Sequence, residues 1–313
     1  MVNSTGYLNK IPAEEFAVVI SLYVLLSFAV VTGNGLVLVA FSINERLRTA
    51  TNKLIMGLAV SDILVGFLSV PCWLSITILS SLSTVTFVTY QFYITMDIFI
   101  GSASILQLTA LSIERCHAIV RPLLHRTLSK KVYCFLITIP WLYSAAIATL
   151  QPVQYQRWKD IYTLIMTTTC FFIPFVTIFI AYFLIYRYAR CQPIAKHRSE
   201  RKAYKKDLRL SMTLAVVTGL FVLAWLPLFT LTLIGTYYPQ YLPDTEWTAR
   251  LLQLAKFCHY SNSALNPLVY ACRNNEIMRT FRYIAHRLAC KETQSPRSLS
   301  KTSSYRVSSR RSS

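Results

Sequence analysis

The sequence contains few charged residues, and acidic residues are the scarcest of them. Of its 313 residues, 14% are charged, and 13 Asp and Glu stand against 32 Lys and Arg. Soluble domains carry about 25% charged residues, so this deficit favours a chain that lies in a membrane. The net charge of +19 raises nucleic-acid binding as an alternative. Because the basic residues lie in short segments between long apolar runs, we predict no nucleic-acid partner.

Features of a secreted, disulfide-linked protein are also missing. The chain has eight cysteines, and none falls in a segment that we place outside the cell, so we predict no extracellular disulfide framework. The sequence also lacks the C-x-x-C spacing that would indicate a metal site. Glu14 and Glu15 precede the first apolar run without a basic segment, which argues against a cleavable signal peptide. A sequon begins at Asn3 and predicts glycosylation there if the N-terminus faces outward.

Long apolar runs, in contrast, are abundant. A helix needs about 20 apolar residues to cross a hydrocarbon core of about 30 Å. Seven runs qualify, at Phe16–Ile43, Leu54–Ile78, Phe87–Ile113, Val132–Leu150, Ile161–Tyr186, Leu210–Ile234 and Leu251–Ala271. We therefore predict an all-α integral membrane protein, with a seven-transmembrane helix bundle at residues 16–271 after an extracellular N-terminus at residues 1–15.

The basic residues predict how this bundle is oriented. Of the 32 Lys and Arg, 27 lie after the first, third and fifth runs or beyond the seventh run, counting Arg115 at the inner end of the third helix. Cytoplasmic loops of membrane proteins carry such an excess of basic residues. The sequence thus predicts a multi-pass protein of the plasma membrane, with its N-terminus outside the cell and its C-terminus in the cytoplasm.

Two further segments follow the seventh run. Within residues 272–291, apolar side chains recur at helical spacing, at Ile277, Phe281, Ile284 and Leu288. This pattern predicts an amphipathic eighth helix in contact with membrane lipids. Cys290 at its end is a candidate for palmitoylation, with an unmodified thiol as the alternative. Residues 292–313 are rich in Ser, Thr, Lys and Arg, which predicts a disordered cytoplasmic tail.

Charged residues inside a predicted span are costly and usually functional. Asp62 lies about midway along the second run. Hydroxyl and amide side chains of the third and seventh runs could surround it, at Ser104, Asn262, Ser263 and Asn266. Oxygen ligands suit a hard cation such as sodium, and a hydrated polar network without an ion is the alternative. We predict no other cofactor.

Asp97 lies nearer the outer end of the third run, about five turns before Arg115. This depth suits a pocket that opens to the outside, where a carboxylate would pair with a cationic ligand. Lys256 in the seventh run offers an alternative, because it could form an internal salt bridge with Asp97 instead.

Several short motifs occur in order along the runs. They are Gly33-Asn34-Gly35, Leu58-Ala59-Val60-Ser61-Asp62, Glu114-Arg115-Cys116, Trp141, Pro174, Trp225-Leu226-Pro227 and Asn266-Pro267-Leu268-Val269-Tyr270. Together they resemble the LAxxD, DRY, CWxP and NPxxY motifs of the rhodopsin-like (class A) G-protein-coupled receptors. The resemblance covers all seven runs. It implies a receptor, not an enzyme, that binds an extracellular ligand and activates heterotrimeric G proteins, with arrestin as a further partner.

The resemblance also implies roles for individual residues. A switch at the cytoplasmic end would comprise Glu114, Arg115, Asp207, Tyr182 and Tyr270. A packing switch beneath the ligand would comprise Pro174, Ile105 and Phe221. The sodium site would comprise Asp62, Ser104, Asn262 and Asn266. Ligand binding would then favour one arrangement of a bistable helix bundle.

Within this family, Asp97 matches the aspartate that pairs with the ligand ammonium in aminergic members, and Tyr260 matches the tyrosine that braces it. The resemblance also implies Trp225, Phe229, Thr167 and Cys170 at the ligand site, and Lys256 is a further candidate there because of its place in the seventh run. The resemblance therefore favours a small ligand that is a cation of the biogenic-amine type.

Three departures from the family pattern leave other ligands open. Cys116 replaces the DRY tyrosine, Tyr90 replaces the usual outer cysteine of the third helix, and Phe257 replaces a tryptophan of aminergic members. A lipid- or peptide-binding receptor of the same fold is therefore the alternative. A membrane transporter is disfavoured, because we find neither internal repeats nor Gly/Pro-interrupted helices at the midplane.

Overall fold

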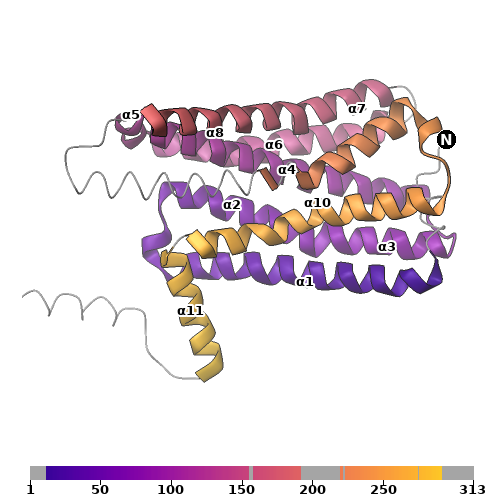
Figure 1. The fold of residues 1–313 in the computed structure, drawn as a ribbon, viewed down its shortest axis with the longest axis horizontal. Helices are drawn as coiled ribbons and strands as arrows, with labels where there is room; N and C mark the ends of the chain where they lie inside the picture. The colour runs from indigo at the N-terminus through magenta and orange to yellow at the C-terminus, as the bar shows by residue number, and fades with distance from the viewer. Residues whose placement is uncertain (1–11, 155–157, 192–218, 221–222, 274, 291–313) are drawn as a thin grey trace, which may run out of the picture.

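The computed structural model describes residues 12–154, 158–191, 219–220, 223–273 and 275–290. Within these ranges all regular secondary structure is helical, and the long helices run side by side along the molecule (Figure 1). This arrangement confirms the prediction of an all-α bundle.

The long helices follow the predicted apolar runs. They are α1 (Ala13–Ile43), α2 (Ala50–Leu64) continued by η3 (Val65–Ser69) and α3 (Val70–Ser81), α4 (Phe87–Val120), α6 (Lys130–Gln154), α7 (Lys159–Thr167) continued by η4 (Thr168–Phe172) and α8 (Ile173–Cys191), the helix Leu223–Tyr237, and α10 (Glu246–Arg273). Short helices between them are η2 (Glu45–Leu47), α5 (Pro122–Arg126) and η5 (Pro239–Tyr241). Most of the predicted run at residues 210–222 lies outside the described residues.

Composition separates α10 from the other long helices. Five helical stretches of the described chain are long and apolar enough to cross a membrane, and the shorter helix Leu223–Tyr237 is also apolar. α10 has 28 residues, which at 1.5 Å per residue is about 42 Å and ample for a crossing. Its polar side chains, including Lys256, His259 and Asn262, are buried in the bundle. α10 is therefore polar because it faces the interior, where a membrane protein keeps such residues.

Two helices widen just before a proline. The N–H of Val70 bonds to the carbonyl of Val65, five residues earlier, and Pro71 follows. In the same way, the N–H of Ile173 bonds to the carbonyl of Thr168, and Pro174 follows. A proline has no N–H and its ring crowds the preceding turn, so each helix passes through one wide turn there. The second wide turn holds Cys170 in the interior.

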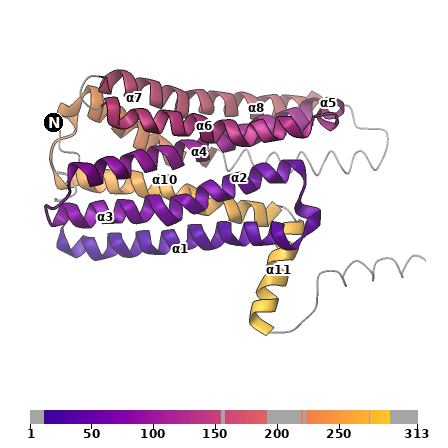
Figure 2. The same cartoon turned by 180° about the vertical axis from the view of Figure 1, so that it is seen from behind.

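α4 forms the centre of the bundle. It packs against α2, α6 and α8, and both views show it in the middle with α1 at one edge (Figures 1 and 2). The most apolar part of α4 is 67% buried, against 17% for α1. Large apolar side chains of α1, such as Leu25 and Phe28, face outward. Such an exposed apolar surface of α1 suits contact with lipid. The side chains of α4 face the interior instead, where they can contribute to a buried site.

α11 (Asn275–Cys290) matches the predicted amphipathic helix. Figures 1 and 2 show it leaving the bundle at an angle to the long helices. Ile277 and Ile284 are buried, whereas Arg279, Arg282 and Arg287 are exposed. α11 therefore presents one apolar face inward and one basic face outward, which is the arrangement of a helix that lies at a membrane surface.

Candidate functional site

Asp97 and Lys256 form an ion pair inside the bundle, near the amino-terminal ends of α4 and α10. Lys256 Nζ lies 2.6 Å from Asp97 Oδ2. The hydroxyl of Tyr260 donates to Asp97 Oδ1 at 2.9 Å, and that of Tyr93 donates to Oδ2 at 3.4 Å. Only 8% of the Asp97 side chain and 10% of the Lys256 side chain are exposed. The carboxylate therefore has both oxygens occupied by partners from its own helix and from α10.

Aromatic rings surround the ammonium group of Lys256. Its Nζ lies 5.3 Å from the ring centres of Trp73 and Tyr93 and 5.7 Å from that of Tyr260. Ring faces attract a cation at such distances. The indole N–H of Trp73 is held in turn by Gln253 Oε1 at 3.1 Å. This cage, made of Trp73, Tyr93 and Tyr260, stabilises a positive charge next to a carboxylate, as recognition of an amine requires.

Other predicted ligand-site residues lie deeper in the bundle. Trp225 packs on His259, with ring centres 3.8 Å apart, and on Phe229 at 5.6 Å. Phe229 stacks in turn on Phe171 at 4.4 Å. His259 also contacts the ring of Tyr260 at 4.6 Å. A continuous set of ring contacts thus joins the Asp97 pair to the core.

The two predicted ligand-site residues of α7 and η4, Thr167 and Cys170, are buried without reaching Asp97 in any described contact. Thr167 donates its hydroxyl to the carbonyl of Thr163, within its own helix. Cys170 is fully buried and packs with Ile147 and Tyr162. Their roles in ligand binding stay predictions.

A cavity of about 260 Å³ lies beside the ion pair. It is lined by residues of α4, α6, α7, the helix Leu223–Tyr237 and α10, together with Leu242. None of the predicted ligand-site residues lines it, but their helical neighbours do. Ile94 and Ile98 flank Asp97 on α4, and Leu252 lies one turn before Lys256 on α10. The cavity is therefore lined by helical neighbours of the pair and not by Asp97 or Lys256 themselves.

Asp62 is the centre of a second buried polar cluster. Its Oδ1 accepts hydrogen bonds from Ser104 at 3.2 Å and Ser263 at 2.7 Å, and its Oδ2 accepts one from Asn266 at 2.8 Å. The side-chain oxygens of Asn262 and Asn266 are buried and have no hydrogen-bond partner among the described residues. Carboxylate, hydroxyl and amide oxygens are the ligands that a hard cation takes, so this donor set fits a sodium ion.

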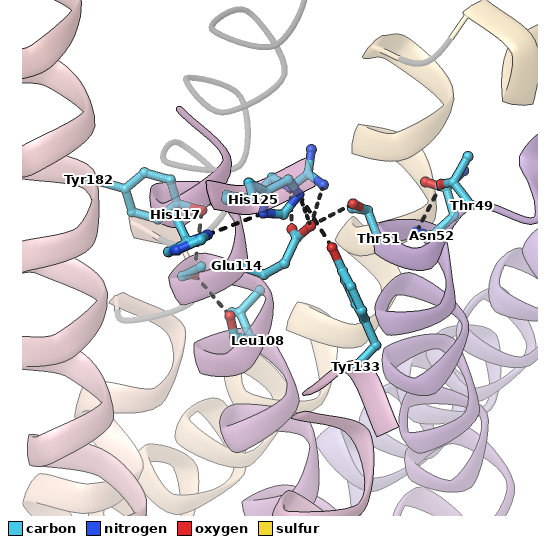
Figure 3. Close-up of polar contacts among 11 residues, drawn as sticks. Thr49, Thr51, Asn52, Leu108, Glu114, His117, His125, Tyr133 and Tyr182 are labelled. Carbon is cyan, nitrogen blue, oxygen red and sulfur yellow. Dashed lines mark hydrogen bonds and ion pairs between the residues drawn. The ribbon is translucent and has the colours of Figure 1, made fainter. Parts of the chain in front are cut away.

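Glu114 and Arg115 form the third polar cluster, at the carboxyl-terminal end of α4 (Figure 3). Arg115 binds both oxygens of Glu114, through Nε at 2.7 Å and Nη2 at 3.1 Å. Thr51 of α2 donates to Glu114 Oε1 at 2.5 Å, and His125 Nε2 of α5 lies 3.4 Å from the same oxygen. Tyr133 of α6 contacts His125 Nε2 at 3.3 Å. Two neighbouring elements, α2 and α5, thus contact this carboxylate directly, and α6 supports it through His125.

The other predicted switch residues are placed less completely. The hydroxyl of Tyr182 accepts a hydrogen bond from Ser112, one turn before Arg115, at 3.4 Å. Tyr270 is buried in the core cluster that also contains Ile105, and Pro174 is buried too. Asp207 and Phe221 lie outside the described residues, as does Asn3. Cys290 is the last residue of α11.

Sequence reasoning missed several side chains that complete these clusters. Tyr93 carried a signal, because it precedes Asp97 by one helical turn and so lies on the same face of α4. The sequence carried no such signal for the other four side chains. These are Trp73 and Gln253 near Asp97, and Thr51 and His125 near Glu114. They reach their partners only through the packing of separate elements.

A bundle of membrane-length helices with ionisable side chains confined to its interior and its ends is the architecture of a membrane receptor. The family model for the 7 transmembrane receptor (rhodopsin family) matches residues 33–270. The chain therefore belongs to the rhodopsin family of seven-transmembrane receptors, which are signalling receptors and not enzymes, and it is a multi-pass membrane protein. This membership confirms the predicted fold and implies coupling to G proteins.

Three relatives illustrate where the chain lies within this family. The histamine H2 receptor of Cavia porcellus is 30% identical, over 85% of this chain and 78% of the relative. The trace amine-associated receptor 1 of Macaca mulatta is 27% identical, over 80% and 83% of the two chains. The adenosine receptor A2b of Gallus gallus is 26% identical, over 85% and 88%. At such identities the family is established, and the ligand is a separate question.

Proposed function

We propose that this receptor binds a small ligand through a protonated amine that pairs with Asp97, and that it signals to a heterotrimeric G protein at the Arg115 end. One observation carries the proposal: Asp97 already binds an ammonium group, that of Lys256, at 2.6 Å. The cage of Trp73, Tyr93 and Tyr260 around that ammonium supports it. The names of the histamine and trace amine relatives support it as well.

The proposal includes an orientation in the membrane. The Asp97 end and the N-terminus face the outside, and the Arg115 end and the C-terminus face the cytoplasm. The distribution of Lys and Arg along the sequence supports this orientation. Glycosylation at Asn3 and palmitoylation at Cys290 are consistent with it. α11 then lies on the cytoplasmic membrane surface among lipids, and the tail beyond it is where arrestin would bind.

The route from ligand to G protein starts with α4 and α10. A ligand that inserts at Asp97 changes the contacts of Lys256 and Tyr260, both on α10. His259, next along α10, presses on Trp225. A shift of α10 therefore moves the ring of Trp225 and the rings packed on it. If these rings have two stable packing arrangements, a change between them transmits the shift to the Arg115 cluster. A sodium ion held by Asp62, Ser104, Asn262 and Asn266 would stabilise one of the two arrangements.

The test uses cells that express the full chain and a panel of biogenic amines with a second-messenger readout. We expect at least one amine to elicit a response, and Asp97→Asn to abolish that response at normal surface expression. Asp160→Asn is the matched control, because Asp160 is exposed on α7 and its contact to Tyr237 uses the backbone carbonyl. A response that survives in Asp97→Asn would instead favour a lipid or peptide ligand, with the Asp97 pair as a structural element.

A further inference from the structure

The charges of Asp97 and Lys256 neutralise each other. This restricts which ligands can displace one of the two partners. A ligand with one ammonium group and no acid would take Asp97 and release Lys256. The released ammonium would then lie buried beside a second cation. Removing one partner from a buried ion pair leaves an uncompensated charge, which is strongly unfavourable. A simple monoamine therefore binds at a penalty that the pair itself creates.

Among the described residues, Asp97 is the one carboxylate that forms a salt bridge with Lys256. Two acids in the first turns of α10 and α1, Glu246 and Glu15, are both bound to Arg250. The remaining neighbours of its ammonium are aromatic rings of the cage. Rings attract a cation more weakly than a carboxylate does, so they do not substitute for Asp97.

The cavity beside the pair is also short of negative charge. Of the residues that line it, Lys159 is the charged one. A ligand that extends from Asp97 into this cavity meets the ammonium groups of Lys256 and Lys159 and the single carboxylate of Asp97. Two positive groups against one negative group favour a ligand that brings an acidic group of its own.

We infer that the ligand is a small zwitterion, with an ammonium group that pairs with Asp97 and an acidic group that pairs with Lys256. Such a ligand exchanges one buried ion pair for two and leaves neither Asp97 nor Lys256 without a partner of opposite charge. The cavity of about 260 Å³ near the pair lies just below the range of drug-sized pockets, and a small ligand suits a site of this size. This inference rests on the amine-binding role proposed for Asp97.

The experiment compares amino acids with their own decarboxylated amines. Full-length receptor in cells is exposed to matched pairs such as histidine and histamine, and tyrosine and tyramine, with dose–response curves for the second messenger. At least one zwitterion is expected to act at lower concentration than an amine that lacks its acid. Lys256→Gln is expected to weaken that zwitterion by about 30-fold or more, as loss of a buried charged partner does, and to strengthen the simple amine.

Lys256→Arg serves as the matched control, because it keeps a positive charge at the same position. It is expected to retain the preference for the zwitterion, and surface labelling of each variant separates loss of binding from loss of folding. A wild-type receptor that prefers the simple amine, with Lys256→Gln leaving this preference unchanged, would overturn the inference and leave the amine-binding function intact. Activation by ligands without an amine, insensitive to Asp97→Asn, or silence towards both sets at normal surface expression, would overturn the two together.

Discussion

The two ends of α4 each carry a buried carboxylate bound to a cation, and the two pairs are built differently. Asp97 binds Lys256, which is 159 residues away on α10. Glu114 binds Arg115, its neighbour in the chain. The first pair joins two helices, so a molecule that enters between the partners acts directly on how α4 and α10 pack. The second pair joins α4 to itself, and within the described part of the chain Thr51 and His125 connect it to other elements.

This difference suggests that the two ion pairs of α4 have different roles. A pair that spans two helices suits a site where a ligand competes for one partner. A pair between sequence neighbours suits a latch, because Arg115 stays beside Glu114 until surrounding elements move. The following four variants test this difference in role between the two pairs, from the largest expected effect to the smallest.

The largest effect is expected from separating the partners of the outer pair. Asp97→Asn leaves the buried ammonium of Lys256 without a carboxylate, which should cost about 3–5 kcal/mol of stability. The double variant Asp97→Asn/Lys256→Met should regain most of that loss, because no charge is left over. Thermal unfolding of purified receptor in detergent measures both. Equal destabilisation in the single and double variants would contradict this prediction, because removing the ammonium group would then recover no stability.

Glu114→Gln should mainly change signalling. The neutral amide weakens the two hydrogen bonds to Arg115 and those to its neighbours, and bonds to charged groups contribute about 1.5–3 kcal/mol. We expect ligand-free second-messenger signalling to rise about tenfold or more, with ligand affinity changing much less. A change of ligand affinity as large as that of signalling would contradict the latch.

Gly101→Ala probes the region between the two ends. A Cβ there would lie 2.9 Å from Cη2 of Trp225 and 3.5 Å from Cε1 of His259. The indole ring must move to accommodate it, and overpacking of this kind costs about 1–3 kcal/mol. Since the two rings join the Asp97 pair to the core, we expect the substitution to alter agonist potency and ligand-free signalling together. An effect on agonist potency alone would place Trp225 in the ligand site only.

The smallest effect is expected from Thr51→Val, which removes one hydrogen bond to Glu114 and preserves shape. A loss of about 1 kcal/mol corresponds to about a fivefold rise in ligand-free signalling. Thr177→Val is the control, because the hydroxyl of Thr177 bonds only to the carbonyl of Ile173 in its own helix. The same rise in both variants would exclude a specific role for α2 in holding Glu114.

Some features of this receptor could be predicted from sequence because they depend on one helix at a time. The apolar runs gave helices at the expected places, and the face of α11 that carries Ile277 and Ile284 is buried as its spacing indicates. Asp62 with Ser104 and Asn266 also came together as predicted. α10 was predicted as a span despite its polar residues, and they face inward.

Partnerships between helices were harder to predict. Asp97 had two candidate partners, a ligand and Lys256, and spacing along the chain could not decide whether the second lies within reach. His125 and Thr51 were not singled out at all, because a short loop helix and the start of α2 must fold against α4 before either meets Glu114.

The sequence alone determined the number of membrane spans, the family and the positions of the isolated charges, because these depend on hydrophobic length and on local motifs. Only the tertiary structure decided that Lys256 fills the place beside Asp97 and that α2 and α5 converge on Glu114. The physical reason is the distance along the chain over which each property is set. A membrane span depends on about 20 consecutive residues. An ion pair such as Asp97–Lys256 instead needs two side chains from distant helices to lie within about 4 Å of each other.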